Sequence, residues 1–466
     1  ITSMTYPNGR TVNYTRNPKG DVQEVRMTLN GVTTALVSSM SYRPDGLPSN
    51  LSFGNNLTDT RTYDTQGRLT YQSIGTADTR LYTYDANGNL TKLQSLPQVG
   101  TYTYDVLDRL KQEDRTTQGT ISTTWTYDPN GNRRTENTGT YAYLANSNRL
   151  QSTPAGTMSL DAAGNTLSDG ARSYTYNNAG QLAQVNSATY SYNGKRQRSR
   201  KIVGSQVTVF HYDLQGNLIT ETNASGNLIR DYVWVNAIPV AQVEAGEQVR
   251  YLHSDHLNTP RLATNASGVK IWSWEGEAFG NTQPTGTVTV NLRFPGQYYD
   301  AESGLHYNWN RYYDPKLGRY VTSDPIGIAG GLNTYSYVDN NPLRYVDPLG
   351  LSSELIPDPA NMPESEQEIR DALDMIPDMI PGGAAIKGSQ AIFICMAKDF
   401  RKKPGSLGKF KSTDALRREN RMARDVAGAE NLNRDQMKRL HDEISGQNLT
   451  YEQIREIARQ IAKGKL

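Results

Sequence analysis

Short runs of alternating apolar and polar residues fill roughly the first 240 positions of the chain. Tyr82 and Tyr84 show the pattern: they are separated by one residue, so both rings lie on the same face of a strand. The same spacing recurs at Tyr102/Tyr104, Tyr174/Tyr176 and Tyr190/Tyr192. Asp, Asn and Gly follow these runs, and these residue types favour turns. The pattern therefore predicts short strands that are joined by tight turns.

The strands and turns belong to a repeated unit, Tyr-Asp-x-x-Gly-(Arg or Asn)-Leu. Clear copies begin at Tyr63, Tyr84 and Tyr212, and further copies, some degenerate, begin at Tyr104, Tyr127 and Tyr176. Most copies are 20 to 23 residues apart, which leaves room for two short strands and two turns. The Asp and Gly fit an Asx-type turn, and the Leu returns to the apolar face. One unit cannot bury its own face, so the copies must stack into one long sheet.

Composition agrees with a strand-rich protein. The chain has 29 Tyr against 7 Phe, together with 40 Gly, and its apolar fraction is only 36%. The mean hydropathy of -0.67 argues against a compact α/β enzyme. We interpret the tyrosine ladder as structural, with a carbohydrate-binding platform as the alternative. The single cysteine, Cys395, excludes a disulfide within the chain.

The segment from residue 310 to residue 351 separates two kinds of sequence. Repeats run into it, and none follow it. It contains three Asp-Pro steps, which begin at Asp314, Asp324 and Asp347. Each Pro fixes its own φ and keeps the preceding Asp out of the α region, so we expect turns and short strands here.

This segment resembles the C-terminal core of RHS/YD-repeat proteins. The resemblance rests on the SDPIG run at residues 323–327, the GGLN run at 330–333 and the closing DPLGL at 347–351. It implies that the repeats spiral into a hollow β shell, although their periodicity alone permits an open β solenoid. It also implies that the core cuts the chain between Leu351 and Ser352 by an aspartyl-protease-like reaction, which releases a C-terminal toxin.

Such a reaction needs two carboxyl groups that share a proton, because like charges held close together split their pKa values. We predict that Asp324 and Asp347 are this pair, and that Arg319 and Asp339 support them. The alternative is that the Asp-Pro steps are ordinary turns whose carboxylates only accept backbone N–H bonds.

The segment 251–280 resembles the stretch that precedes the core in the same family. His253, Asp255 and His256 lie close together in it, but a metal site needs three or four converging ligands. We therefore expect structural hydrogen bonding, no metal and no cofactor. Asn258 stands where the family usually has Gly, which predicts a slightly different turn. In the aromatic segment 293–313, which we expect to plug or cap the shell, His306 is interpreted as a packed core residue.

Beyond Leu351 the composition changes. Residues 352–397 hold 2 Lys and Arg against 8 Asp and Glu, whereas residues 398–466 hold 17 against 10. We predict that residues 352–411 are an acidic linker rich in Pro and Gly, because its prolines prevent a long helix. The pattern from residue 412 onward predicts three short helices, the last of which begins at a Thr450–Gln453 capping box and carries Ile454, Ile457 and Ile461.

The tail has no strong catalytic motif. Basic side chains on its first two predicted helices suit a phosphate backbone, and they include Arg417, Arg421, Arg424 and Lys438. His441, Asp442 and Glu443 are the candidate general base and carboxylates, although His441 can equally flank the core beside Leu440. Three alternatives stay open: a toxin that cleaves nucleic acid, another intracellular toxin enzyme, and a non-catalytic or membrane-active module.

The predicted organisation is a repeat shell at 1–292, the core at 293–351, the linker at 352–411 and a helical toxin domain at 412–466. The chain opens within a repeat, so we expect a longer protein whose missing N-terminal part engages secretion machinery. The expected protein is a secreted or cell-surface effector that is delivered to a target cell cytoplasm. Its expected partners are a cognate immunity protein, its own enclosed toxin and a nucleic-acid target. The competing hypothesis is a surface adhesion or carbohydrate-binding protein whose chain stays intact.

Overall fold

The computed structural model describes residues 2–95, 98–116, 119–355 and 451–462. The chain divides into two compact units: the described residues up to 355 lie in the first, and helix α5 lies in the second. Among the described residues, no helix has the length and apolar character that a membrane crossing requires.

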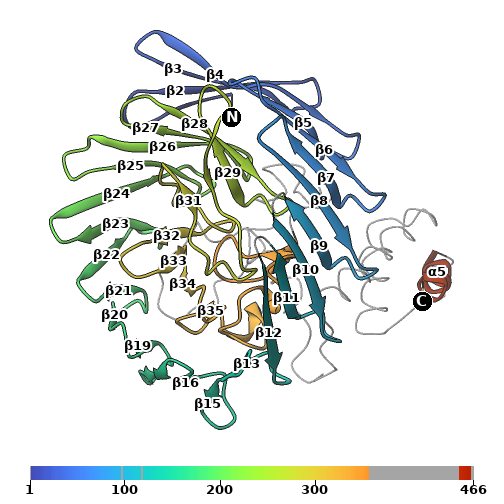
Figure 1. The fold of residues 1–466 in the computed structure, drawn as a ribbon, viewed down its shortest axis with the longest axis vertical. Helices are drawn as coiled ribbons and strands as arrows, with labels where there is room; N and C mark the ends of the chain where they lie inside the picture. Colours follow the sequence, from blue (N-terminus) through green and yellow to red (C-terminus); the bar gives the residue numbers. More distant parts are fainter. Residues whose placement is uncertain (1, 96–97, 117–118, 356–450, 463–466) are drawn as a thin grey trace. The chain divides into compact units, whose positions relative to one another are not determined.

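Two large antiparallel sheets, each in simple meander order, make the wall of the first unit (Figure 1). The first sheet has 14 strands: β1 (Ser3–Thr5), β2 (Thr11–Arg16), β3 (Val22–Leu29), β4 (Val32–Tyr42), β5 (Pro48–Phe53), β6 (Thr58–Tyr63), β7 (Leu69–Ile74), β8 (Asp78–Tyr84), β9 (Leu90–Ser95), β10 (Gln98–Tyr104), β11 (Leu110–Thr116), β12 (Thr120–Tyr127), β13 (Arg133–Glu136) and β14 (Gly139–Thr140). The second has 12 strands: β20 (Tyr174–Tyr176), β21 (Leu182–Val185), β22 (Ala188–Tyr192), β23 (Arg198–Val203), β24 (Gln206–Tyr212), β25 (Leu218–Thr222), β26 (Leu228–Val235), β27 (Ile238–Glu244), β28 (Val249–Ser254), β29 (Pro260–Thr264), β30 (Lys270–Ser273) and β31 (Thr285–Gly286).

Smaller elements connect these sheets and follow them. The connecting strands are β15 (Ala142–Tyr143), β16 (Leu150–Thr153), β17 (Gly156–Thr157), β18 (Ser159–Leu160) and β19 (Thr166–Ser168). The core consists of β32 (Tyr298–Asp300), β33 (Leu305–Asn308), β34 (Arg311–Asp314), β35 (Arg319–Tyr320), the 3-10 helices η1 (Gly327–Gly330) and η2 (Val338–Asn340), β36 (Tyr345–Val346) and β37 (Glu354–Leu355). The turns and short strands expected for residues 310–351 are thus confirmed, with two 3-10 helices besides.

The Asp of each repeat closes its own turn. Asp64 Oδ1 accepts the backbone N–H groups of Gln66 and Arg68, both at 2.9 Å. Its Oδ2 accepts the side chain of Arg68 at 2.6 Å, while Gly67 adopts a φ of 76°. Asn89 replaces the arginine in the next turn and donates to Asp85 Oδ2 at 2.9 Å. One carboxylate therefore satisfies a whole turn, which explains why Asp, Gly and Arg or Asn recur at fixed spacing.

The Tyr of each repeat ties its strand to the preceding hairpin. Tyr84 Oη donates to the Leu69 carbonyl at 2.7 Å, and Tyr104 Oη donates to the Leu90 carbonyl at 2.7 Å. The same contact recurs at Tyr127 with Leu110, Tyr192 with Leu182 and Tyr212 with Arg198. Because these hydroxyls already serve backbone carbonyls, the ladder acts as part of the sheet.

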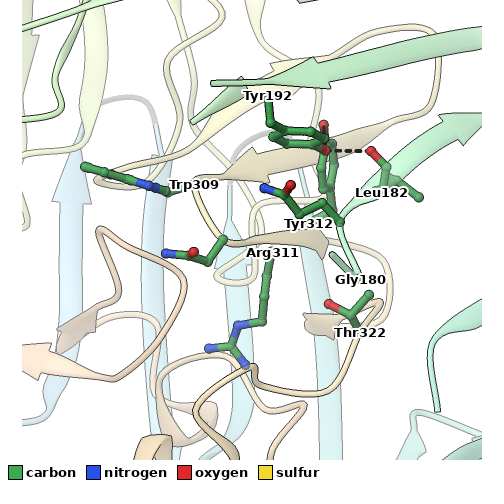
Figure 2. Close-up of a pocket in the computed structure, with 9 residues that line it drawn as sticks. Gly180, Leu182, Tyr192, Trp309, Arg311, Tyr312 and Thr322 are labelled. Carbon is green, nitrogen blue, oxygen red and sulfur yellow. Dashed lines mark hydrogen bonds between the residues drawn. The ribbon is translucent and has the colours of Figure 1, made fainter. Parts of the chain in front are cut away.

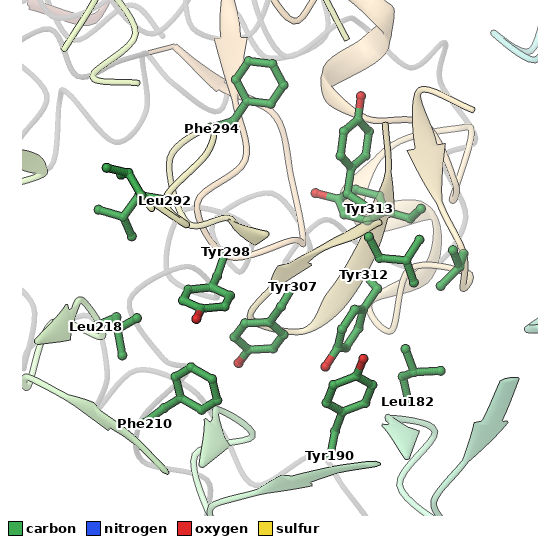
Figure 3. Packing of buried hydrophobic residues seen from close by; sticks show 14 of the residues in the cluster. Leu182, Tyr190, Phe210, Leu218, Leu292, Phe294, Tyr298, Tyr307, Tyr312 and Tyr313 are labelled. Carbon is green, nitrogen blue, oxygen red and sulfur yellow. The ribbon is translucent and has the colours of Figure 1, made fainter. Parts of the chain in front are cut away.

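Aromatic side chains from the core hairpins fill the space beside the second sheet (Figure 3). Tyr298, Tyr307 and Tyr312 point toward Phe210 and Tyr190. Arg198, which is fully buried, lies within 6 Å of the ring centroids of all five residues and pairs with Asp300. The core is thus held against the wall by rings and one buried ion pair.

Polar contacts join the first sheet to the second. Arg10 Nε pairs with Asp231 Oδ2 at 3.0 Å, and both side chains are buried. Arg61 Nη2 donates to the Ser254 carbonyl at 3.0 Å, and Asn55 donates to Thr264 Oγ1 at 2.9 Å. The repeats therefore form a β shell in which the two sheets face each other.

Helix α5 (Tyr451–Ala462) confirms the last helix predicted from the sequence. Ile454, Ala458 and Ile461 are buried on one face, at the three- and four-residue spacing of an amphipathic helix. The first two predicted helices and the linker from residue 356 lie outside the described residues.

The turn at Asn258 corrects one prediction. Asn258 has a φ of 57°, and its N–H donates to the Asp255 carbonyl at 3.1 Å, as that of Gly67 donates to Asp64 at 3.2 Å. The turn is therefore the ordinary repeat turn, because Asn tolerates the left-handed region that Gly usually occupies.

Candidate self-cleavage site

Asp324 and Asp347 come together in the core. Asp324 follows β35 and Asp347 follows β36, 23 positions apart in sequence, and both are buried. Arg311 Nη2 lies 2.9 Å from Asp324 Oδ2 and 3.2 Å from Asp347 Oδ2. A single nitrogen thus links the two carboxylates, so the pair expected from the sequence shares one small site.

Asp324 is the carboxyl group that is ready to hold a proton. Burial, together with the neighbouring charge of Asp347, raises its pKa to about 6, although Arg311 and the N–H of Ile326 act in the opposite direction. The Ile326 N–H donates to Asp324 Oδ1 at 3.0 Å. Close to neutral pH, Asp324 therefore exists partly as the neutral acid.

Asp347 touches the peptide bond at which the cut is predicted. Its Oδ1 accepts the N–H of Leu351 at 2.8 Å and the N–H of Ser352 at 3.1 Å. Its Oδ2 accepts the hydroxyl of Tyr320 at 2.7 Å. Burial raises the pKa of Tyr320 well above its ordinary value, so this hydroxyl stays protonated and donates. Asp347 therefore lies at the nitrogen that would leave in a hydrolysis.

The carbonyl oxygen of the same bond lies near Asp324. A Cβ atom on Gly330 would overlap both the Leu351 carbonyl oxygen and Asp324 Oδ2, so these two oxygens border the same small space. A Cβ atom on Gly350 would overlap the Asn308 carbonyl oxygen. Only glycine allows the chain to approach this closely, which brings the Leu351–Ser352 bond between the two aspartates.

Arg311 holds the site from several directions. Its Nε donates to the Gly350 carbonyl at 2.5 Å, its Nη1 donates to the Thr334 carbonyl at 3.1 Å, and its guanidinium carbon lies 3.6 Å from the ring centroid of Tyr320. These contacts fix the position of the planar guanidinium group, which pairs with both carboxylates. Sequence reasoning missed Arg311 and Gly330, and the one signal for them was their place within residues 310–351.

A small cavity adjoins Arg311 on the side of the second sheet (Figure 2). Its volume is about 10 Å³, which is close to the least that holds one water molecule. Tyr192, Trp309, Arg311, Tyr312 and Thr322 are among the residues that line it. Its lining includes Arg311 but neither Asp324 nor Asp347, and neither residue of the predicted cut.

The described contacts of the two residues predicted to support the pair are with other groups. Arg319 donates to the Asn148 carbonyl at 2.6 Å and lies over the rings of Tyr143 and Tyr335. Its described hydrogen bonds and ion pairs include neither Asp324 nor Asp347. Asp339 accepts the hydroxyl of Ser353 at 2.7 Å, one residue beyond the predicted cut.

The histidines of the shell are hydrogen-bonded. His253 Nε2 pairs with Thr264 Oγ1 at 2.9 Å, and His256 Nε2 pairs with the Leu343 carbonyl at 2.9 Å. Asp255 pairs with Arg261 at 2.7 Å, and His306 is buried against Gln297 at 2.7 Å. Burial lowers the pKa of all three histidines. Within the described part of the chain, no cluster of side chains has a metal-binding arrangement.

The tail candidates lie outside the described residues. They are Arg417, Arg421, Arg424, Lys438, His441, Asp442 and Glu443. Their roles stay predictions.

The fold and the turns define a YD-repeat β shell that is closed by a core of short strands. The chain matches the Teneurin YD-shell family over residues 95–343, more than half of its length, and it belongs to that family.

Two curated relatives are similar to parts of this chain. The tRNA3(Ser)-specific nuclease WapA of Bacillus spizizenii is 31% identical over 271 residues, which cover 53% of this chain and 12% of the relative. The double-stranded DNA deaminase toxin A of Burkholderia cenocepacia is 36% identical over 131 residues, which cover 26% of this chain and 9% of the relative. The chain thus spans a small part of the length of these relatives.

The solved structures agree with the fold. The Tc holotoxin pore of Photorhabdus luminescens matches 76% of this chain and 21% of its own with a TM-score of 0.64 at 21% identity. At this identity the likeness shows the shared β shell alone.

Proposed function

We propose that the core is an aspartyl-type self-cleaving protease that cuts between Leu351 and Ser352. The observation that carries the proposal is the placement of this bond between two carboxyl groups. Asp347 Oδ1 accepts the Ser352 N–H at 3.1 Å, and the Leu351 carbonyl oxygen shares the space above Gly330 with Asp324 Oδ2. An ordinary turn aspartate such as Asp64 takes its described partners from within its own turn.

The roles follow from this placement. One water molecule is consumed: Asp347 takes a proton from it as the oxygen attacks the Leu351 carbonyl carbon, and neutral Asp324 gives its proton to the carbonyl oxygen. Asp347 then passes its proton to the Ser352 nitrogen, the bond breaks, and Asp324 recovers its own proton from the intermediate. The products are a carboxyl group on Leu351 and an amine on Ser352. Arg311 holds both carboxylates in position throughout.

In the wider role that we propose, the β shell encloses the C-terminal part until the cut frees it as a toxin that acts on nucleic acid in a target cell. Relatives named as a tRNA nuclease and a DNA deaminase toxin support this proposal. The protein would be secreted or displayed on the cell surface, delivered to the target cytoplasm, and paired with an immunity protein in the producing cell. Expression of residues 352–466 in a cytosol, with and without the immunity protein, tests this role: growth that is unaffected in both cases contradicts it.

Intact-mass measurement of the purified chain tests the cleavage. The wild type should give a fragment that begins at Ser352, whereas Asp324→Asn and Asp347→Asn should leave the chain whole, because an amide cannot exchange the proton. Loss of general acid–base catalysis lowers rates by about 10²- to 10⁴-fold. Asp64→Asn, in a repeat turn, is the matched control and should cleave normally. A wild-type chain that stays intact under native conditions would support the adhesion hypothesis instead.

A further inference from the structure

The first residues beyond the predicted cut lie on a built surface of the core. Strand β37 pairs with β36 in an antiparallel ladder, with Val346 opposite Glu354 and Tyr345 opposite Leu355. Ser353 Oγ donates to Asp339 Oδ2 at 2.7 Å. The chain on the far side of the scissile bond is therefore held by backbone pairing and by a hydrogen bond to a carboxylate, which is stronger than one between neutral groups.

The turn that presents Asp339 has an unusual backbone. Val338, Asp339 and Asn340 have φ values of 42°, 53° and 61°, so three consecutive residues lie in the left-handed region. A β-branched residue such as Val338 rarely adopts this conformation, which costs on the order of 1–3 kcal/mol. Strain of this kind persists only where the surroundings hold it, and it is concentrated at functional sites.

Two asparagines attach this turn to the first sheet. Asn340 donates to the Gly131 carbonyl at 3.0 Å, and Asn341 donates to Asn89 Oδ1 at 2.9 Å and to the Asp108 carbonyl at 2.8 Å. Three different repeat turns thus fix the position of Asp339. The repeats themselves therefore support the surface that receives the residues after the cut.

We propose that residues 338–346 are a docking site for the N-terminus that cleavage creates, with residues 352–355 of the released fragment as its ligand. This proposal rests on the proposed self-cleavage. It adds that a specific interface retains the cleaved fragment, whereas the shell alone would retain it only by excluding it from bulk solvent. After hydrolysis, the strand pairing and the Ser353–Asp339 hydrogen bond are unchanged, because neither involves the broken bond. The new amine of Ser352 stays beside Asp347 Oδ1, where opposite charges attract each other. The fragment consequently remains attached by its first four residues after it is cut.

The experiment uses the full chain and two readouts from one sample. Intact mass gives the fraction that is cleaved, and gel filtration after timed incubation in mild urea gives the rate at which the fragment separates from residues 1–351. Ser353→Ala should leave cleavage in place and speed separation by about tenfold, as expected for a lost hydrogen bond to a charged group. Ser353→Ala combined with Leu355→Pro, which also disturbs the ladder, should speed it further.

Ser273→Ala is the matched control, because Ser273 also makes a hydroxyl contact across a two-residue ladder, to Thr285 at 3.1 Å. It should separate like the wild type. The docking proposal is wrong if Ser353→Ala, alone and combined with Leu355→Pro, cleaves normally and its fragment separates at the wild-type rate.

An uncleaved wild type would instead remove the self-cleavage proposal. Hydrogen exchange of the segment that contains residues 352–355 then tests the dock in the intact chain. Faster exchange there in Ser353→Ala supports the dock, and unchanged exchange refutes it.

Discussion

Each core aspartate shares one turn contact with the aspartates of the repeats, yet the surroundings of the two kinds of aspartate differ. Asp64 Oδ1 accepts N–H groups two and four residues ahead; Asp324 Oδ1 accepts one two residues ahead, and Asp347 Oδ1 accepts one four residues ahead. In the repeat, Oδ2 is satisfied within the turn by Arg68. In the core, the Oδ2 atoms of both aspartates turn to a distant residue, Arg311.

Burial separates the two regions. The Asp64 side chain is 21% exposed, whereas that of Asp324 is 2% exposed. Burial acts to raise the pKa of Asp64, but the backbone and side-chain hydrogen bonds from Arg68 and Gln66 outweigh it and lower that pKa. Burial prevails at Asp324, which has one backbone donor and shares its arginine, and the pKa rises to about 6. The pKa of a turn aspartate thus rises when the aspartate is buried and shares its arginine with a second carboxylate.

The largest effect should come from the shared arginine. Arg311→Lys keeps the charge but loses the N–H groups that fix the guanidinium at the Gly350 and Thr334 carbonyls, so self-cleavage should slow by about 10²-fold, as misplaced catalytic groups do. Time courses of cell-free synthesised chain, followed by intact mass, measure the rate. Arg68→Lys is the matched change in a repeat turn and should cleave at the wild-type rate. Equal rates in the two variants would show that the shared contact does not matter.

A methyl group at Gly330 should come next. It would overlap the Leu351 carbonyl oxygen and Asp324 Oδ2, so Gly330→Ala should push the bond from the acid and slow cleavage by roughly tenfold or more. The same time course measures the effect. Gly194→Ala is the control, because nothing lies within 4 Å of a Cβ at that position. Unimpaired cleavage in Gly330→Ala would place the reacting carbonyl somewhere else.

The pH dependence should report the raised pKa of Asp324. Its neutral form prevails below a pH of about 6, so cleavage that uses this proton should be fast there and fall by about tenfold per pH unit at higher pH. Time courses between pH 5 and 8 measure the profile. If the pKa of Asp324 were lowered like that of Asp64, the rate would fall from about pH 5 upward without a break near pH 6. A rate that stayed constant from about pH 5 to 8 would show that cleavage does not use this proton.

The smallest effect should be on a repeat turn. Asp64→Ala removes the acceptor of two backbone N–H groups and should lower the free energy of unfolding by about 1 kcal/mol, as a lost turn hydrogen bond does, without any change in cleavage. Urea unfolding followed by tyrosine fluorescence measures the loss. Thr65→Ala, an exposed change in the same turn, is the control and should leave the unfolding midpoint in place. A large loss of cleavage in Asp64→Ala would contradict this prediction and show that the repeat turn affects the cleavage site.

The sequence by itself determined the repeats, because the contacts that define them are local. Asp64, Gly67 and Arg68 close one turn within five residues, and the tyrosine spacing places rings on one face of a strand. Helix α5 was likewise visible from the spacing of Ile454 and Ile461. The Asp324 and Asp347 pair was predictable only as a family resemblance, because nothing in either Asp-Pro step says that the two meet.

Only the tertiary structure decided how the site is assembled. Arg311 reaches its partners across 13 to 39 positions of sequence, and it was indistinguishable beforehand from Arg319, which points to Asn148 instead. Gly330 lies close to Leu351, and Ser353 donates a hydrogen bond to Asp339. Both contacts depend on the core packing against itself and against three repeat turns. Local propensity has no access to such contacts, because packing between distant segments creates both the burial that raises the pKa of Asp324 and the geometry that places the bond beside it.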